Sequence, residues 1–164
     1  MSEFKEHAIG GIIAYLVFFL VILLSIFLPE LGFSWRPNSS IWISRSGWAI
    51  ASCFLIALLS ALWPDVDIQS HSRKIFYRIF LVLDVYLILI KEYRIAAFLG
   101  LFAILPMIGK HRGWTHSKIT MLLLPSPLLI FPMLARGEVT WIGLPFYTAS
   151  ILGYASHLAL DRKL

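Results

Sequence analysis

The chain has 164 residues, of which 59% are hydrophobic, so it is more apolar than a typical soluble domain. Its net charge of +5 does not indicate nucleic-acid binding, because no basic stripe is interleaved with aromatic residues and basic residues that flank membrane helices give the same excess. The only cysteine, Cys53, excludes an internal disulfide and is most simply a small buried hydrophobic residue.

Long apolar runs follow one another along the chain. They are 8–28, 47–63, 75–90, 95–108, 119–135 and 139–160. A helix needs roughly 20 residues to cross a bilayer, within a range of about 17 to 25. The third and fourth runs are shorter, so they need flanking residues or form a shallow hairpin. The sequence therefore predicts an all-α, polytopic transmembrane helix bundle with about four to six membrane helices, and residues 1–164 form a single integral-membrane domain.

Local features refine two of these runs. The first is too long for the apolar core of a removable signal peptide, so we expect it to remain as a membrane helix. Gly10 and Gly11 near its start would allow a neighbouring helix to approach closely. The fifth run contains Pro125, Pro127 and Pro132, which predict a kinked or broken helix.

If all the runs cross, their connectors alternate between the two sides of the membrane. One side receives the N-terminus, segments 64–74 and 109–118, and the C-terminus. The other side receives 29–46, 91–94 and 136–138. Basic residues are more numerous on the first side, which the positive-inside rule assigns to the cytoplasm. We therefore expect both termini on the cytoplasmic side.

The most informative polar interruption is His111-Arg112-Gly113-Trp114-Thr115-His116-Ser117. His111 and His116 can each offer an imidazole nitrogen to a metal, and Arg112 could neutralise a phosphate or a developing oxyanion. Gly113 permits a turn, and Thr115 is placed to cap a helix that begins near His116. The positive-inside rule also explains the basic residues in this segment, so its interpretation as a functional site rests on the two histidines.

Two further pairs carry metal-binding groups. Asp65 and Asp67 follow Pro64 and could hold one cation or bridge two. His157 and Asp161 are four residues apart on a predicted helix, so both side chains could reach one ion. Taken alone, each pair is better explained by a solvated turn or a polar helix end.

Taken together, these groups are stronger evidence for a metal site than either pair alone, because all of them and His7 fall on one side of the expected topology. This holds even if 75–108 is a hairpin that does not cross, since the parity of the other segments is unchanged. Apolar proteins rarely keep such groups without pairing or using them. The sequence therefore predicts a metal site at a membrane surface. Asp84 lies apart, within the third run, as an ion-pair candidate for Arg78 or Lys91 or as the lining of a polar cavity.

The chain resembles the YdjM-like family of inner-membrane proteins, which are described as metal-dependent hydrolases, one of them LexA-binding. The resemblance lies in Pro64-Asp65-Val66-Asp67, in the 111–117 block and in Gly153-Tyr154-Ala155-Ser156-His157-Leu158-Ala159-Leu160-Asp161. It spans nearly the whole chain, although Ile68 stands where relatives often have a histidine. It implies a bacterial inner-membrane location and metal ligation by His7, Asp65, Asp67, His111, His116, His157 and Asp161.

These features predict a membrane-embedded metal-dependent hydrolase of a phosphorylated or ester-bearing lipid. One or two divalent ions, zinc by preference and manganese as the alternative, would activate water. Asp65 or Asp67 would accept the proton, and Arg112 would stabilise charge on the substrate. The expected partners are the bilayer and a lipid substrate, with no nucleic acid.

Two other functions remain open at this stage. In one, the protein is a non-enzymatic adaptor whose metal staples its helices while a cytosolic protein docks on the basic face. In the other, it is an ion transporter, which requires ionisable residues at mid-membrane depth, where only Asp84 qualifies.

Overall fold

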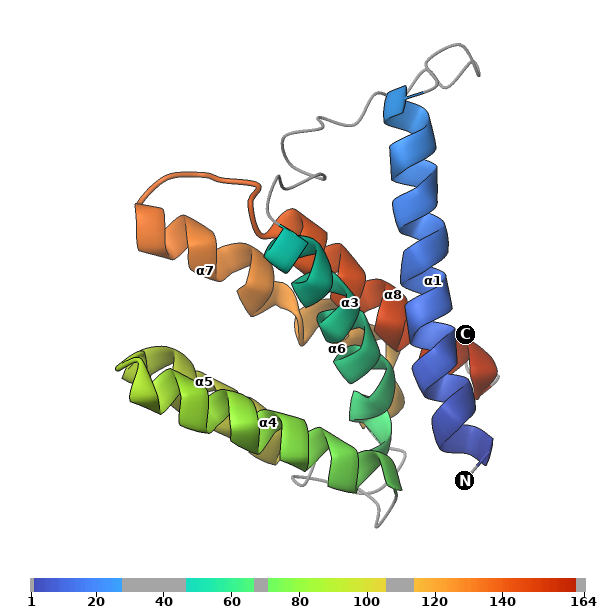
Figure 1. The fold of residues 1–164 in the computed structure, drawn as a ribbon, viewed down its shortest axis with the longest axis horizontal. Coiled ribbons are helices and arrows are strands. Elements are labelled where there is room, and N and C mark those ends of the chain that lie inside the picture. Colours follow the sequence, from blue (N-terminus) through green and yellow to red (C-terminus); the bar gives the residue numbers. More distant parts are fainter. Residues whose placement is uncertain (1, 28–46, 67–70, 106–113, 162–164) are drawn as a thin grey trace.

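The computed structural model describes residues 2–27, 47–66, 71–105 and 114–161, and the regular structure in these ranges is helical (Figure 1). The α-helices are α1 (Ser2–Phe27), α3 (Gly47–Leu62), α4 (His71–Leu89), α5 (Tyr93–Ile104), α6 (Lys118–Leu123), α7 (Ser126–Arg136) and α8 (Leu144–Leu160). Two 3-10 helices, η2 (Trp63–Asp65) and η4 (Trp114–His116), follow α3 and precede α6. The prediction of an all-α bundle is confirmed for this part of the chain.

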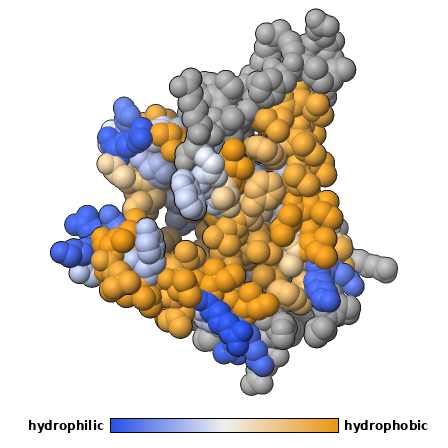
Figure 2. Space-filling model, viewed as in Figure 1, coloured by the Kyte–Doolittle hydropathy of each residue, from blue (hydrophilic) through white to orange (hydrophobic). Residues whose placement is uncertain are grey.

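Three described segments are long and apolar enough to cross a membrane. They are Phe4–Ser25, Gly47–Asp65 and Lys118–Arg136. The surface over α1 and the α4–α5 hairpin is mostly apolar, as Figure 2 shows, and hydrophilic residues gather near the helix ends. The predicted total of about four to six membrane helices stays a prediction, and so does the placement of both termini on one side of the membrane. The two ends of the described chain do lie together in the bundle (Figure 1).

The centre of the bundle is a contact of backbone against backbone between α1, α3 and α8. A Cβ atom added to Gly153 would lie 2.1 Å from the carbonyl oxygen of Ala57. A Cβ atom added to Gly11 would lie 2.6 Å from the Cβ of Ala61. Only glycine allows such approaches, which confirms the close packing expected at the start of the first helix. Small residues thus set the spacing of these three helices.

The remaining helices pack around this centre. α4 and α5 form an antiparallel hairpin (Figure 1), in which the hydroxyl of Tyr77 donates to the carbonyl of Ala103 at 2.9 Å. The rings of Phe98 and Phe131, 6.0 Å apart, connect α5 to α7. The expected break in the fifth run is confirmed at Pro125, which separates α6 from α7.

Replacing Gly153 with valine should destabilise the protein by about 3 kcal/mol, since an overpacked contact here must displace the backbone of α3. Thermal unfolding followed by circular dichroism in detergent measures this change. Gly100→Ala is the matched control, because a Cβ atom there meets nothing within 4 Å. Equal melting temperatures for the two variants would contradict the packing described here.

Candidate metal centre

Five of the predicted ligands meet at one end of the bundle, although they come from distant parts of the chain. They are His7 of α1, Asp65 of η2, His116 of η4, His157 of α8 and Asp161 at the end of α8. All five side chains are buried or half-buried. The structure thus assembles a histidine–carboxylate cluster from segments that the sequence only placed on a common side.

The two carboxylates lie between the three imidazole rings. Asp65 lies 3.9 Å from Nε2 of His7, 3.7 Å from that of His116 and 3.6 Å from that of His157. The corresponding distances from Asp161 are 3.5, 3.4 and 3.7 Å. The same nitrogen of each histidine therefore faces both carboxylates.

These separations suit a metal shell better than direct hydrogen bonds. Hydrogen bonds between nitrogen and oxygen are usually about 2.7 to 3.2 Å long. Ligands at about 2.0 to 2.1 Å from a tetrahedral zinc ion lie roughly 3.3 Å from one another. The nitrogen–oxygen distances of 3.4 to 3.9 Å are close to that spacing, and two overlapping groups of three side chains could each hold a metal ion.

His157 is held in the tautomer that a metal requires. Its Nδ1 lies 2.8 Å from the carbonyl oxygen of Ala61, which can only accept, so Nδ1 carries the proton and donates it. The lone pair of Nε2 then points towards the carboxylates, and Nε2 has no hydrogen-bond partner within the described ranges. The ring is fully buried and stacks on His7 at 4.0 Å between centroids. A carbonyl that orients a metal-binding imidazole in this way is a common supporting contact in metal sites.

His116 is positioned by the short helix η4 and the turn that follows it. Ser117 accepts a hydrogen bond from the backbone amide of Thr120 and so caps α6. The prediction that Thr115 caps this helix is therefore wrong, because the helix begins two residues later than expected. Thr115 instead places its hydroxyl 3.1 Å from Nδ1 of His116, where it supports the imidazole ring.

An aromatic cluster joins the elements that carry these ligands. The ring of Trp63 lies 5.6 Å from that of Trp114, 5.8 Å from Phe102 and 6.0 Å from Tyr154. The hydroxyl of Tyr154 donates to the carbonyl of Thr115, directly before His116. The sequence interpretation did not include these supporting residues, although Trp63 and Trp114 adjoin the two polar segments and could have indicated them.

The described ligands form one site rather than two. They contain the overlapping groups His7, Asp65, His157 and His116, His157, Asp161, each with ligand atoms within 4.8 Å of one another. Both groups need Nε2 of His157, which has a single lone pair. A second ion would therefore need ligands from elsewhere in the chain. Asp67, His111 and Arg112, which were also predicted for this site, lie outside the described residues.

Asp84 does not belong to this cluster. No ion pair joins it to Arg78 or Lys91 within the described part of the chain, and its Oδ1 is buried without a hydrogen-bond partner. The ion pair considered for Asp84 is therefore not formed. Asp84 does line a pocket, but the walls of that pocket are almost entirely apolar, so the prediction of a polar cavity is wrong.

Comparison with known proteins adds no relatives: no family model matches the sequence, and no curated protein or solved structure gives a match.

We expect the purified protein to hold about one zinc ion per chain, and chelation to lower its melting temperature, because the buried ligands lose the cation between them. Elemental analysis by mass spectrometry and thermal unfolding with and without EDTA measure both effects. A well-folded sample that is free of metal, and whose melting temperature chelation leaves unchanged, would contradict the assignment.

Replacing Tyr154 with phenylalanine should lower metal affinity about tenfold while leaving the helices folded, since such supporting contacts are worth roughly 10- to 100-fold in metal binding. The substitution removes only the hydroxyl that holds the carbonyl of Thr115. Competition with a chromophoric chelator measures the affinity, and Tyr147→Phe is the matched control, because the hydroxyl of Tyr147 donates to Leu122 away from the ligands. Equal affinities in the two variants would show that Tyr154 does not position the site.

Proposed function

We propose that this protein is a membrane-embedded metal-dependent hydrolase that acts on a phosphorylated or ester-bearing lipid. The gathering of three histidines and two aspartates into two overlapping groups that could hold a metal ion supports the proposal most directly. Imidazole nitrogen and carboxylate oxygen are the ligands of catalytic zinc in many hydrolases, and manganese is the alternative ion. The likeness to the YdjM-like family leads to the same activity.

The chemistry follows from the ligand set. When bound, zinc lowers the pKa of a water molecule towards about 7 and so makes a nucleophile available at neutral pH. Five candidate ligands are more than a tetrahedral ion needs, and Asp65 is proposed as the carboxylate that takes up the proton from the water molecule. Asp67 is the second candidate for this role, and Arg112 is proposed to stabilise negative charge on the substrate oxygens.

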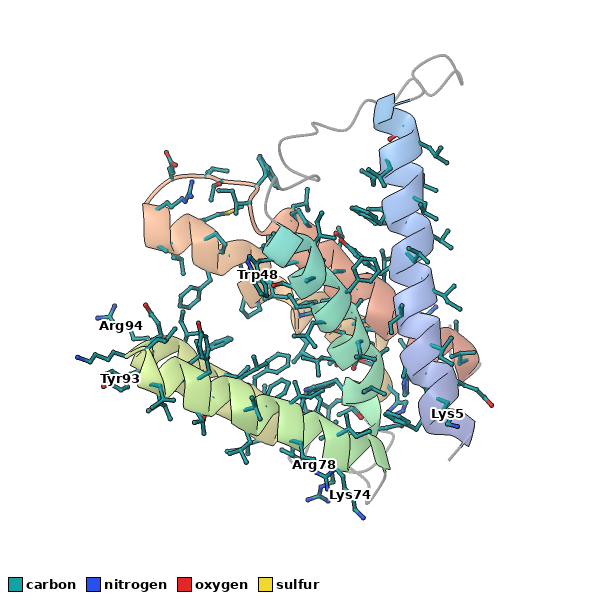
Figure 3. The ribbon with its side chains drawn as sticks, in the orientation of Figure 1. Lys5, Trp48, Lys74, Arg78, Tyr93 and Arg94 are labelled. Carbon is teal, nitrogen blue, oxygen red and sulfur yellow. The ribbon has the colours of Figure 1, made fainter. Side chains whose placement is uncertain are left out.

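Exposed cations near the site favour an anionic substrate. Lys5 of α1 and Lys74 and Arg78 of α4 project at the end of the bundle where the two chain ends lie (Figure 3). Lys118, also exposed, begins α6 two residues after His116. Such a group attracts phosphate and is also typical of helix ends at the cytoplasmic face. We infer that the site faces the cytoplasm of a bacterial inner membrane and receives the headgroup of a lipid from the adjacent leaflet.

The hydrolase proposal is tested with metal-loaded protein in liposomes that contain a panel of phosphorylated lipids. His116→Ala and Asp161→Asn should lose bound metal, and headgroup release should fall about 100-fold or more. Glu138→Gln is the matched control, because this exposed carboxylate lies beyond α7 and should retain both properties. Arg112→Ala separates the two roles, since it should keep the metal and lose turnover.

A protein that binds metal tightly but releases no product from any lipid would contradict the hydrolase proposal. That result would favour the adaptor, in which the ion only staples the helices. Its cytosolic partner would then be sought on the same basic face.

A further inference from the structure

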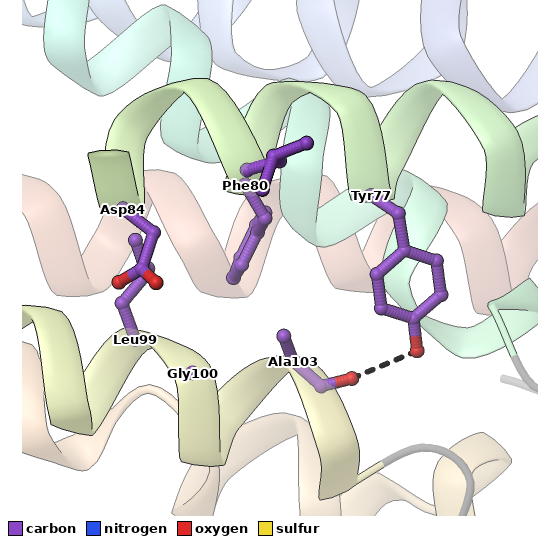
Figure 4. A pocket seen from close by; sticks show the side chains of 7 residues that line it. Tyr77, Phe80, Asp84, Leu99, Gly100 and Ala103 are labelled. Atoms are coloured by element: carbon purple, nitrogen blue, oxygen red, sulfur yellow. Dashed lines mark hydrogen bonds between the residues drawn. The ribbon is translucent and has the colours of Figure 1, made fainter. Parts of the chain in front are cut away.

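A second site of different character lies in the α4–α5 hairpin. A pocket of about 280 Å³ opens between the two helices (Figure 4). Its walls are Tyr77, Phe80, Leu81 and Asp84 from α4 and Leu99, Gly100 and Ala103 from α5. None of these residues belongs to the metal centre. Since a cavity of roughly 150 Å³ in another protein is enough to bind benzene, this pocket has room for a larger apolar molecule.

The pocket follows from the spacing of residues on the two helices. The four residues of α4 follow the pattern i, i+3, i+4 and i+7, so they share one face of that helix. On α5, Gly100 leaves open space, because a Cβ atom added there would meet nothing within 4 Å. The hydrogen bond from Tyr77 to Ala103 fixes the distance between the helices next to this space. The missing side chain at Gly100 and the hydrogen bond from Tyr77 together account for the hollow.

One end of this apolar pocket carries a carboxylate. Figure 4 shows Asp84 directed from α4 towards Leu99 of α5. Its Oδ1 is buried and has no hydrogen-bond partner among the residues that the structure describes. The positions three and four residues away on α4 are Leu81, Phe80, Leu87 and Ile88, so no cation lies within one turn of Asp84 on this helix. An acidic group in such surroundings is expensive unless a partner meets it.

We infer that this pocket binds a small amphiphilic amine, whose alkyl chain lies along Tyr77, Phe80 and Leu99 and whose ammonium group pairs with Asp84. The charge complements the carboxylate, and the alkyl chain complements the apolar walls. From Asp84 to Tyr77 the helix rises about 10 Å, which suits a medium-length alkyl chain. The site is independent of the proposed hydrolase activity, because it shares no residue with the metal centre.

The test uses the full-length, metal-loaded protein in lipid nanodiscs and two photoreactive probes of equal chain length. One is an alkyl diazirine that ends in a primary amine, and the other ends in a hydroxyl group. We expect the amine probe to label peptides within 77–103 about tenfold more than the alcohol probe, because only the ammonium group forms a charged pair with Asp84. Unlabelled octylamine in excess should suppress this labelling.

Two variants and one control make the test specific. Asp84→Asn should abolish the preference for the amine, and Gly100→Leu should fill the pocket and reduce labelling by both probes about tenfold. Glu92→Gln removes the same charge from an exposed position on the hairpin and should change nothing. Helical content and metal content, measured for each variant, show that the fold is retained. Equal labelling by the two probes, or a preference for the amine that survives Asp84→Asn, would refute the assignment.

Discussion

The close approach of α1, α3 and α8 around Ala57 is the constraint on which the candidate metal centre depends. On each of the three helices, small residues and candidate metal ligands follow one another at intervals of four residues. This series runs from Ala57 to Ala61 on α3 and on to Asp65 of η2, and from Gly153 to His157 on α8 and on to Asp161 at its end. On α1 it runs backwards from Gly11 to His7. Because residues four apart lie on one face of a helix, the small residues that bring the backbones together direct the ligands into one space, a turn or two further along.

The contact between α3 and α8 also links structure to chemistry. Ala61 lies one turn from Ala57, and its carbonyl oxygen accepts the hydrogen bond that fixes the tautomer of His157. That bond is possible only because Gly153 lets the two helices meet without an intervening side chain. In a membrane, where apolar surface gives little drive for helices to associate, close backbone packing supplies the association. The same packing therefore stabilises the bundle and prepares the metal ligand.

Much of this arrangement could be predicted from the sequence, and the reasons for the remainder are physical. Apolar runs located the helices, and the alternation of sides placed His7, Asp65, His116, His157 and Asp161 on one face. Pro125 correctly marked the break between α6 and α7. The supporting contacts could not be predicted, because the ring contacts of Trp63 and the hydrogen bond from Tyr154 to Thr115 join residues far apart in the chain. The orientation of the α4–α5 hairpin is likewise a tertiary property that periodicity does not encode.

The carboxylates of the candidate metal centre and that of Asp84 lie in different chemical surroundings. Asp65 and Asp161 are surrounded by imidazole nitrogens at 3.4 to 3.9 Å, in an arrangement that could hold a divalent cation. Asp84 stands among leucine and aromatic side chains, where no nitrogen ligands of the described chain accompany it. Partial burial of a carboxylate is costly in both places unless positive charge meets it. The two proposals differ in the form of that charge, because clustered imidazoles suit a metal ion, whereas an apolar wall beside a single carboxylate suits an organic cation with a hydrocarbon chain.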